Sequence, residues 1–207
     1  RNSDTPLMDP THTRRMVTMT DYEYADLIDS QDKIRMLADP TSTYARAAAA
    51  AMGRAMDDVI IAAMHGTAKT GASGATSVSF PAGQQIAHGS AGLTIAKLLS
   101  AKEILDANSV DPSIPRYLVA SPKQMSDLLG TTQVTSSDFN TVKSLVQGQI
   151  DSFMGFKFIS SNRLPHNGTS RQVFAYASDG MKVAIGKEPT AKIDERADKS
   201  YSTQIYY

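Results

Sequence analysis

The chain has 207 residues, enough for one large domain or two small ones, of which 41% are hydrophobic and 20% charged. This composition excludes an intrinsically disordered chain, and the balance of 21 basic against 21 acidic residues argues against tight binding of nucleic acid. The absence of cysteine excludes disulfides and thiolate chemistry, and no apolar run approaches the roughly 18 residues that a membrane span needs.

The first forty residues are rich in acidic side chains. Residues 14–20 alternate in the manner of a strand, and residues 21–37 predict a strand and turn or a poorly formed helix, because their charges recur too often for a buried face. Five carboxylates precede the first basic residue of this stretch: Asp21, Glu23, Asp26, Asp29 and Asp32. Such a run repels itself, so we expect it to meet a basic surface.

The run from Pro40 to Gly66 predicts one helix of about 24 residues. Hydroxyl residues at 41–43 can cap its start, alanines at 47–51 have the best helix propensity, and Gly66 can end it. Arg54 is spaced to pair with Asp57 or Asp58. One broad apolar face is expected, made of Tyr44, Ala48, Ala51, Met52, Ala55, Val59, Ile60, Ala63 and Met64. The pattern fits either a rod laid across a sheet or an ordinary long core helix.

The middle of the chain contains a polar excursion and then a compact pattern of elements. Residues 67–92 have few side chains to bury, and predict a long loop with one short strand or hairpin. A helix is expected from Thr94 to about Asn108, and a short strand at residues 116–120 leads into a helix capped by Ser121. A further helix at residues 138–147 and a strand at residues 156–159 follow.

Strands dominate the C-terminal part. Residues 171–177 and 181–185 predict two strands joined at residues 178–180, and residues 190–195 and 201–207 predict a second strand pair. The fold class expected is α+β. Because the chain begins with Arg1 and ends within a strand pattern, we expect it to be an internal portion of a longer protein.

Catalytic and metal-binding signals are weak. His12, His65, His88 and His166 lie far apart without the spacing of a metal site, and no nucleophile-elbow motif occurs. Asp57 and Asp58, together with the acidic run, could supply an acid–base pair. A solvated or inter-subunit charged face is the better interpretation, so no catalytic, metal or cofactor site is predicted.

The order of these features resembles the major capsid proteins of tailed bacteriophages with the Hong Kong 97-like fold. The likeness lies in the acidic stretch, the helix with Arg54-Ala55-Met56-Asp57-Asp58, the polar loop, and the segments at 117–122 and 155–164. It implies a long spine helix, a peripheral β-sheet and a mixed axial domain. The implied parts are an N-terminal portion with strands and an extended loop (1–40), the spine helix and following loop (41–91), the axial domain (92–186) and returning peripheral strands (187–207).

The same resemblance implies a structural protein of the virion that assembles in the host bacterial cytoplasm. Hexamers and pentamers would tile an icosahedral head around double-stranded phage DNA, held without sequence specificity. Scaffolding, portal or decoration proteins would be further partners. In this interpretation the extended loop of one subunit lies over its neighbour, and charge pairs set the register. Candidate contact residues are Arg14, Arg15, Asp26, Asp29, Asp32, Arg46, Arg54 and Arg163.

Two alternatives remain open from the sequence. An encapsulin-like bacterial nanocompartment shell has the same implied fold and encloses an enzyme instead of DNA. A small hydrolase, with its site in the loop at residues 67–92, belongs to another class of protein and would be a monomer with a concave, carboxylate-lined pocket.

Overall fold

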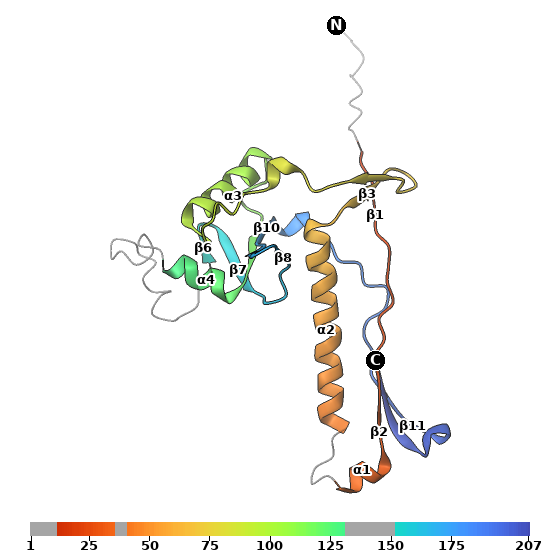
Figure 1. Ribbon diagram of the computed structural model, residues 1–207. Coiled ribbons are helices and arrows are strands. Elements are labelled where there is room, and N and C mark those ends of the chain that lie inside the picture. Colours follow the sequence, from red (N-terminus) through yellow and green to blue (C-terminus); the bar gives the residue numbers. More distant parts are fainter. Residues whose placement is uncertain (1–11, 36–40, 131–151) are drawn as a thin grey trace.

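The computed structural model describes residues 12–35, 41–130 and 152–207. One long helix, α2 (Thr41–His65), forms a rod that connects two separate parts of the subunit (Figure 1). A head of two helices and a four-stranded sheet lies at its C-terminal end, and a three-stranded sheet lies beside its N-terminal half. The subunit is therefore elongated, and its buried residues are divided among separate groups.

Helix α2 confirms the predicted long helix, with 25 residues. Its alanine run has the highest intrinsic helix propensity. The helix ends at His65, and a Cβ atom on the next residue, Gly66, would lie 2.9 Å from the carbonyl oxygen of Ala62. Glycine at this position therefore lets the chain leave the helix without a clash. None of the helices in the described ranges is long and apolar enough to cross a membrane.

The buried side of α2 changes along its length. Ala48 is fully buried in the first half, while Ile61 and Met64 are buried near the C-terminal end. At 3.6 residues per turn, Ala48 and Met64 lie about 160° apart around the helix axis. The first half therefore faces the three-stranded sheet, whereas the end packs on another side against Val119 and Leu164.

The prediction of one continuous apolar face is therefore wrong in part. Tyr44, Val59 and Ala63 were expected on that face and are exposed, while Ile61 was not assigned to it and is buried. The cause is that the helix packs against two partners on different sides. A single apolar stripe along the helix can face only one of these partners.

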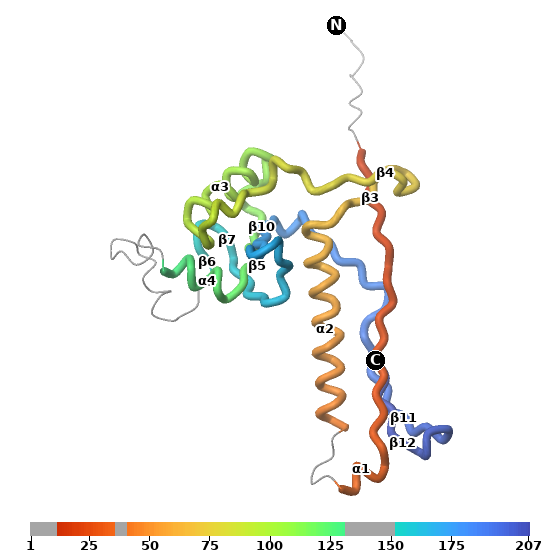
Figure 2. Tube along the Cα trace, in the orientation of Figure 1, coloured from red at the N-terminus to blue at the C-terminus, as the bar shows by residue number. Residues whose placement is uncertain are grey.

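The three-stranded sheet contains β2 (Ala25–Ile28), β11 (Lys192–Arg196) and β12 (Ser202–Tyr206). The order is β11-β12-β2, and both pairings are antiparallel, which confirms the predicted C-terminal strand pair. The inner face carries Ile28, Thr203 and Ile205, all buried, and α2 contacts β12. Figure 2 shows that the N-terminal and C-terminal parts of the chain meet in this sheet.

The short helix α1 (Ser30–Arg35) follows β2 at the tip of the subunit (Figure 2). The Lys33 ammonium donates a hydrogen bond to Thr203 Oγ1 at 3.2 Å, which fastens α1 to β12. Residues 21–37 were predicted to form a strand and turn or a poorly formed helix. In the structure they contain strand β2 followed by the short helix α1. Residues 36 and 37 of that stretch lie outside the described residues.

The head is a four-stranded sheet with the order β10-β5-β7-β6. Its helices are α3 (Ile95–Ala107) and α4 (Pro122–Leu129), and its strands are β5 (Arg116–Ala120), β6 (Ser152–Phe153), β7 (Phe156–Ser160) and β10 (Phe174–Ala177). Strands β5 and β7 are parallel, and the other pairings are antiparallel. The core of the head contains Leu93, Leu98, Leu118, Ala120, Leu128 and Phe156.

Local capping signals predicted the head well. Thr94 caps α3 by accepting from the Lys97 amide, and Asn108 ends the helix. Ser121 caps α4 in a reciprocal capping box with Gln124. On α3, Leu98 is buried and the next residue, Leu99, is exposed. The helix predicted at residues 138–147 lies outside the described residues.

The predicted hairpin at residues 171–185 does not form. Strand β10 instead pairs along its whole length with β5, and Ser178 donates from its amide to the Pro115 carbonyl at 2.9 Å. Residues Ser178–Gly180 form a 3₁₀ turn, and residues 181–185 are not in a strand. The local pattern does not predict this pairing, because the partner strand β5 lies far earlier in the chain.

Three further short pairings complete the fold. The expected excursion contains the hairpin β3 (Ala68–Thr70) and β4 (Thr76–Val78), followed by a 3₁₀ turn at Ala82–Gln84. Strand β1 (Arg15–Met16) pairs with β3 and is much shorter than the strand predicted at residues 14–20. Strands β8 (His166–Asn167) and β9 (Ser170–Arg171) form a separate hairpin.

Candidate assembly surfaces

The acidic segment, residues 21–32, lies on β2 and α1. Two of its carboxylates join the segment around β2 to β12: Glu23 accepts from the Tyr206 hydroxyl at 3.0 Å, and Asp29 accepts from the Ser202 hydroxyl at 3.2 Å. Asp26 makes a local bond, accepting from the Tyr24 hydroxyl at 3.1 Å. These carboxylates raise the pKa of the Tyr24 and Tyr206 hydroxyls, mainly through the hydrogen bonds.

The other two carboxylates of the acidic segment point to solvent. Asp21 is exposed. Asp32 lies 3.9 Å from Arg35, and both side chains are well exposed, so this pair contributes little. Asp21 and Asp32 are therefore the acidic side chains most available for contact with another molecule.

The basic candidates do not meet the acidic segment within one subunit. Arg14 and Arg15 are exposed at β1, which lies at the opposite end of α2 from α1 (Figure 1). Arg46 and Arg54 are exposed on α2. The two sets of opposite charge therefore occupy separate regions of the same chain.

Arg163 differs from the other basic candidates because it has a partner in its own chain. Its guanidinium makes two hydrogen bonds to the carboxylate of Asp58 on α2, with Nε at 2.5 Å from Oδ1 and Nη2 bonded to Oδ2. The sequence paired Asp57 or Asp58 with Arg54, but the structure pairs Asp58 with a residue 105 positions away. The ion pair ties α2 to the segment that follows β7, and it lowers the pKa of the Asp58 carboxyl.

Replacing Arg163 with alanine is expected to raise the pKa of Asp58, because the hydrogen bonds that favour the carboxylate are lost. In the native chain this contribution to stability is present above the usual carboxyl pKa of about 4 and is lost as the pH falls through the lowered value. NMR titration of the Asp58 carboxyl measures the change. Arg46→Ala is the matched control and should leave that pKa unchanged, whereas an unchanged pKa in Arg163→Ala would contradict the pairing.

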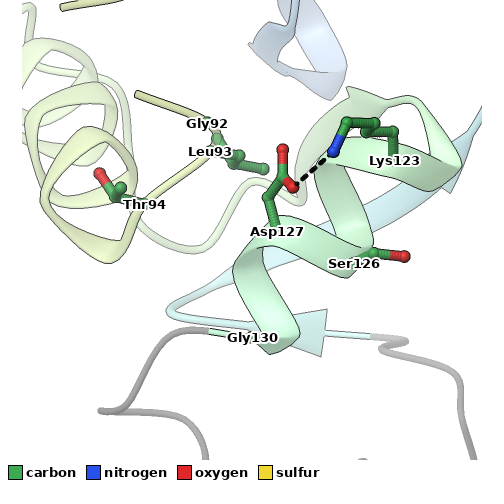
Figure 3. A pocket seen from close by; sticks show the side chains of 7 residues that line it. All are labelled: Gly92, Leu93, Thr94, Lys123, Ser126, Asp127 and Gly130. Atoms are coloured by element: carbon green, nitrogen blue, oxygen red, sulfur yellow. Dashed lines mark hydrogen bonds and ion pairs between the residues drawn. The ribbon is translucent and has the colours of Figure 1, made fainter. Parts of the chain in front are cut away.

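A hollow of about 590 Å³ lies between the start of α3 and helix α4 (Figure 3). It is lined by Gly92, Leu93, Thr94, Lys123, Ser126, Asp127 and Gly130. Its one carboxylate, Asp127, is paired with Lys123 at 3.1 Å. This lining offers no nucleophile with a base beside it, and the described residues include no group of three or more His, Asp and Glu side chains placed to hold a metal ion.

The described residues form separate buried clusters and leave large apolar side chains exposed, among them Val17, Met19 and Val183. Such surfaces are typical of proteins that are completed by contact with other chains. Residues 1–207 match the family model described as phage capsid protein, and the chain belongs to this family. Membership of this family gives the chain a structural role in a phage capsid.

Solved structures show the same fold. A chain from Mycobacterium phage Che8 is similar with a TM-score of 0.62 at 18% identity, covering 89% of this chain and 62% of that one. A chain from the capsid structure of the cyanophage P-SCSP1u is similar with a TM-score of 0.54 at 16% identity, covering 94% of this chain and 76% of that one. The chain thus spans less than two thirds of the length of the Mycobacterium phage protein. No curated protein matches the chain.

Proposed function

We propose that the chain is the major shell protein of an icosahedral phage head and has the Hong Kong 97-like fold. The observation that supports this most is the rod α2, which carries a small sheet along one half and a mixed head at its end. A subunit of this form can span a shell surface, with its head and its sheet contacting different neighbours. It performs no reaction of its own in this proposal.

The proposed parts follow the expected boundaries. Residues 1–40 are the N-terminal strands and extended loop, residues 41–91 the spine helix and following loop of the peripheral domain, residues 92–186 the axial domain, and residues 187–207 the returning peripheral strands. The pairing of β2 with β12, which joins the first and last of these parts, supports the assignment of both to one peripheral region.

The proposed assembly consists of hexamers and pentamers, formed in the host bacterial cytoplasm, around double-stranded DNA. The neutral net charge of the chain is consistent with a wall that contains DNA without holding it tightly. Contacts between subunits would join the acidic segment to basic residues of a neighbour, with Arg14, Arg15, Arg46 and Arg54 available and Arg163 engaged by Asp58. Scaffolding, portal or decoration proteins would bind the assembled shell.

The content of the particles tests this proposal. Particles purified from lysed host cells after infection are expected to hold double-stranded DNA that resists added nuclease and is released when the shell is disrupted. Particles that contain an enzyme and no nucleic acid would identify a nanocompartment shell instead. A monomer that cleaves a small ester or glycoside would support the hydrolase alternative, which the single, paired carboxylate of the hollow does not favour.

A further inference from the structure

The hairpin of β8 and β9 carries an asparagine followed by a glycine at its tip. Asn167 pairs with Ser170 across the two strands, so Gly168 and Thr169 form a two-residue turn. Gly168 has a φ of 62°, in the left-handed region that glycine adopts without strain. All four residues from 166 to 169 are exposed. The turn therefore places an amide side chain directly before a residue that has no side chain to shield its backbone nitrogen.

The described part of the chain contains three asparagines, and their surroundings differ. Asn108 donates to a backbone carbonyl of α3 at 2.7 Å, and Asn162 accepts from Arg171 Nη1 at 3.4 Å. Neither of these two precedes a glycine. Asn167 precedes Gly168, and no described residue forms a hydrogen bond with the Asn167 side chain or the Gly168 amide. Of the three asparagines, this one alone has an unbonded side chain next to an accessible backbone nitrogen.

We propose that Asn167 and Gly168 form a site of spontaneous deamidation through a cyclic imide. Asparagine is a thermolabile residue. The Gly168 nitrogen attacks the side-chain carbonyl carbon of Asn167 and forms a C–N bond, and the amide nitrogen leaves as ammonia with the proton that Gly168 loses. Water then opens the ring, at the side-chain carbonyl to give aspartate or at the backbone carbonyl to give isoaspartate. One water is consumed and one ammonia is released, with no oxidation or reduction.

The closed hairpin restrains this reaction. In an extended residue such as Asn167 the side chain and the following backbone nitrogen point in different directions, so the ring closes only when the turn opens. Two backbone pairs and one side-chain bond, from Arg171 Nε to His166 Nε2 at 3.0 Å, hold the strands together. Residues 166–171 belong to neither buried cluster of the described chain. Opening such a hairpin costs much less than global unfolding, so the folded protein reacts slowly.

Both products change the hairpin. Either one replaces a neutral amide with a carboxylate, so a chain with 21 basic and 21 acidic residues gains one negative charge. Isoaspartate also routes the backbone through the side-chain carbonyl and adds one carbon to the chain. The pairing of residue 167 with Ser170 then loses its register, and we expect the hairpin to stay open.

Incubation of the full-length protein in water enriched in oxygen-18 tests the site, because the water that opens the ring leaves its oxygen in the product. Trypsin places the three described asparagines in separate peptides, 103–116, 158–163 and 164–171. Mass spectrometry is expected to find labelled aspartate and isoaspartate in peptide 164–171 and intact asparagine in the other two. In Asn167→Gln the label is expected to disappear, because a larger ring must close. Absence of label from peptide 164–171, or equal label in all three peptides, would overturn the proposed site.

The variant His166→Ala tests the restraint, since it removes the side-chain bond across the hairpin and leaves both ends of the peptide unchanged. The rate of labelling at Asn167 is expected to rise about two- to tenfold, which is the effect of one ordinary hydrogen bond on an opening equilibrium. His12→Ala removes an exposed histidine from another segment and is expected to leave the rate unchanged. Circular dichroism confirms that both variants are folded. A rate in His166→Ala no higher than in the native chain, or an equal rise in His12→Ala, would overturn restraint by the hairpin.

Discussion

Replacing Ala48 with aspartate is expected to lower the free energy of unfolding by about 3 kcal/mol or more. Ala48 is fully buried where α2 lies against the three-stranded sheet, whose inner face carries the buried Ile28 and Ile205. A carboxylate there would lose its water without gaining a partner. Urea unfolding followed by circular dichroism measures the loss.

The matched control for this change is Ala49→Asp. Ala49 is the next residue of the same helix, has the same propensity and is exposed. The control is expected to change the free energy of unfolding by less than about 1 kcal/mol, since exposed helix positions tolerate polar residues. Equal losses in the two variants would contradict the packing of α2 on the sheet.

Replacing Phe156 with alanine is expected to cost about 3–5 kcal/mol of unfolding free energy. The side chain is fully buried at the start of β7 and packs in the cluster that contains Leu98, Leu118 and Leu128. Its removal leaves a cavity that the surrounding sheet and helices cannot fill. Phe80→Ala removes the same atoms from an exposed site and serves as the control, with an expected cost below about 1 kcal/mol.

The unfolding midpoints of both phenylalanine variants can be measured in the same urea series as the parent chain. A Phe156→Ala protein with an unchanged midpoint would mean that the head is not held by this cluster. A loss in Phe80→Ala as large as that in Phe156→Ala would mean that the excursion after α2 is part of the core.

Local signals predicted those parts of the fold in which neighbouring residues decide the structure. The hydroxyl of Thr94 and the reciprocal bonds of Ser121 and Gln124 mark the helix starts within three or four residues. Strand β5 was likewise predicted at its observed bounds, because its apolar run is short and ends at the serine cap. These signals need no knowledge of distant parts of the chain.

Contacts between distant residues explain what the sequence did not predict. The pairing of Asp58 with Arg163 joins residues 105 positions apart, and the pairing of β10 with β5 replaces a hairpin that would have been local. The rotation of the buried side of α2 depends on two partners that lie on different sides of the helix. Val183 and Ile185 were assigned to that hairpin, whereas in the structure both are exposed and lie outside any strand.

Electron microscopy of the full-length protein expressed alone shows whether the chain works as a subunit of a closed shell. We expect closed icosahedral particles of uniform size, in which the copies of α2 lie within the wall and each subunit contacts its neighbours through different surfaces. A protein that remains monomeric at every concentration, with a sedimentation coefficient that does not change, would contradict the claim.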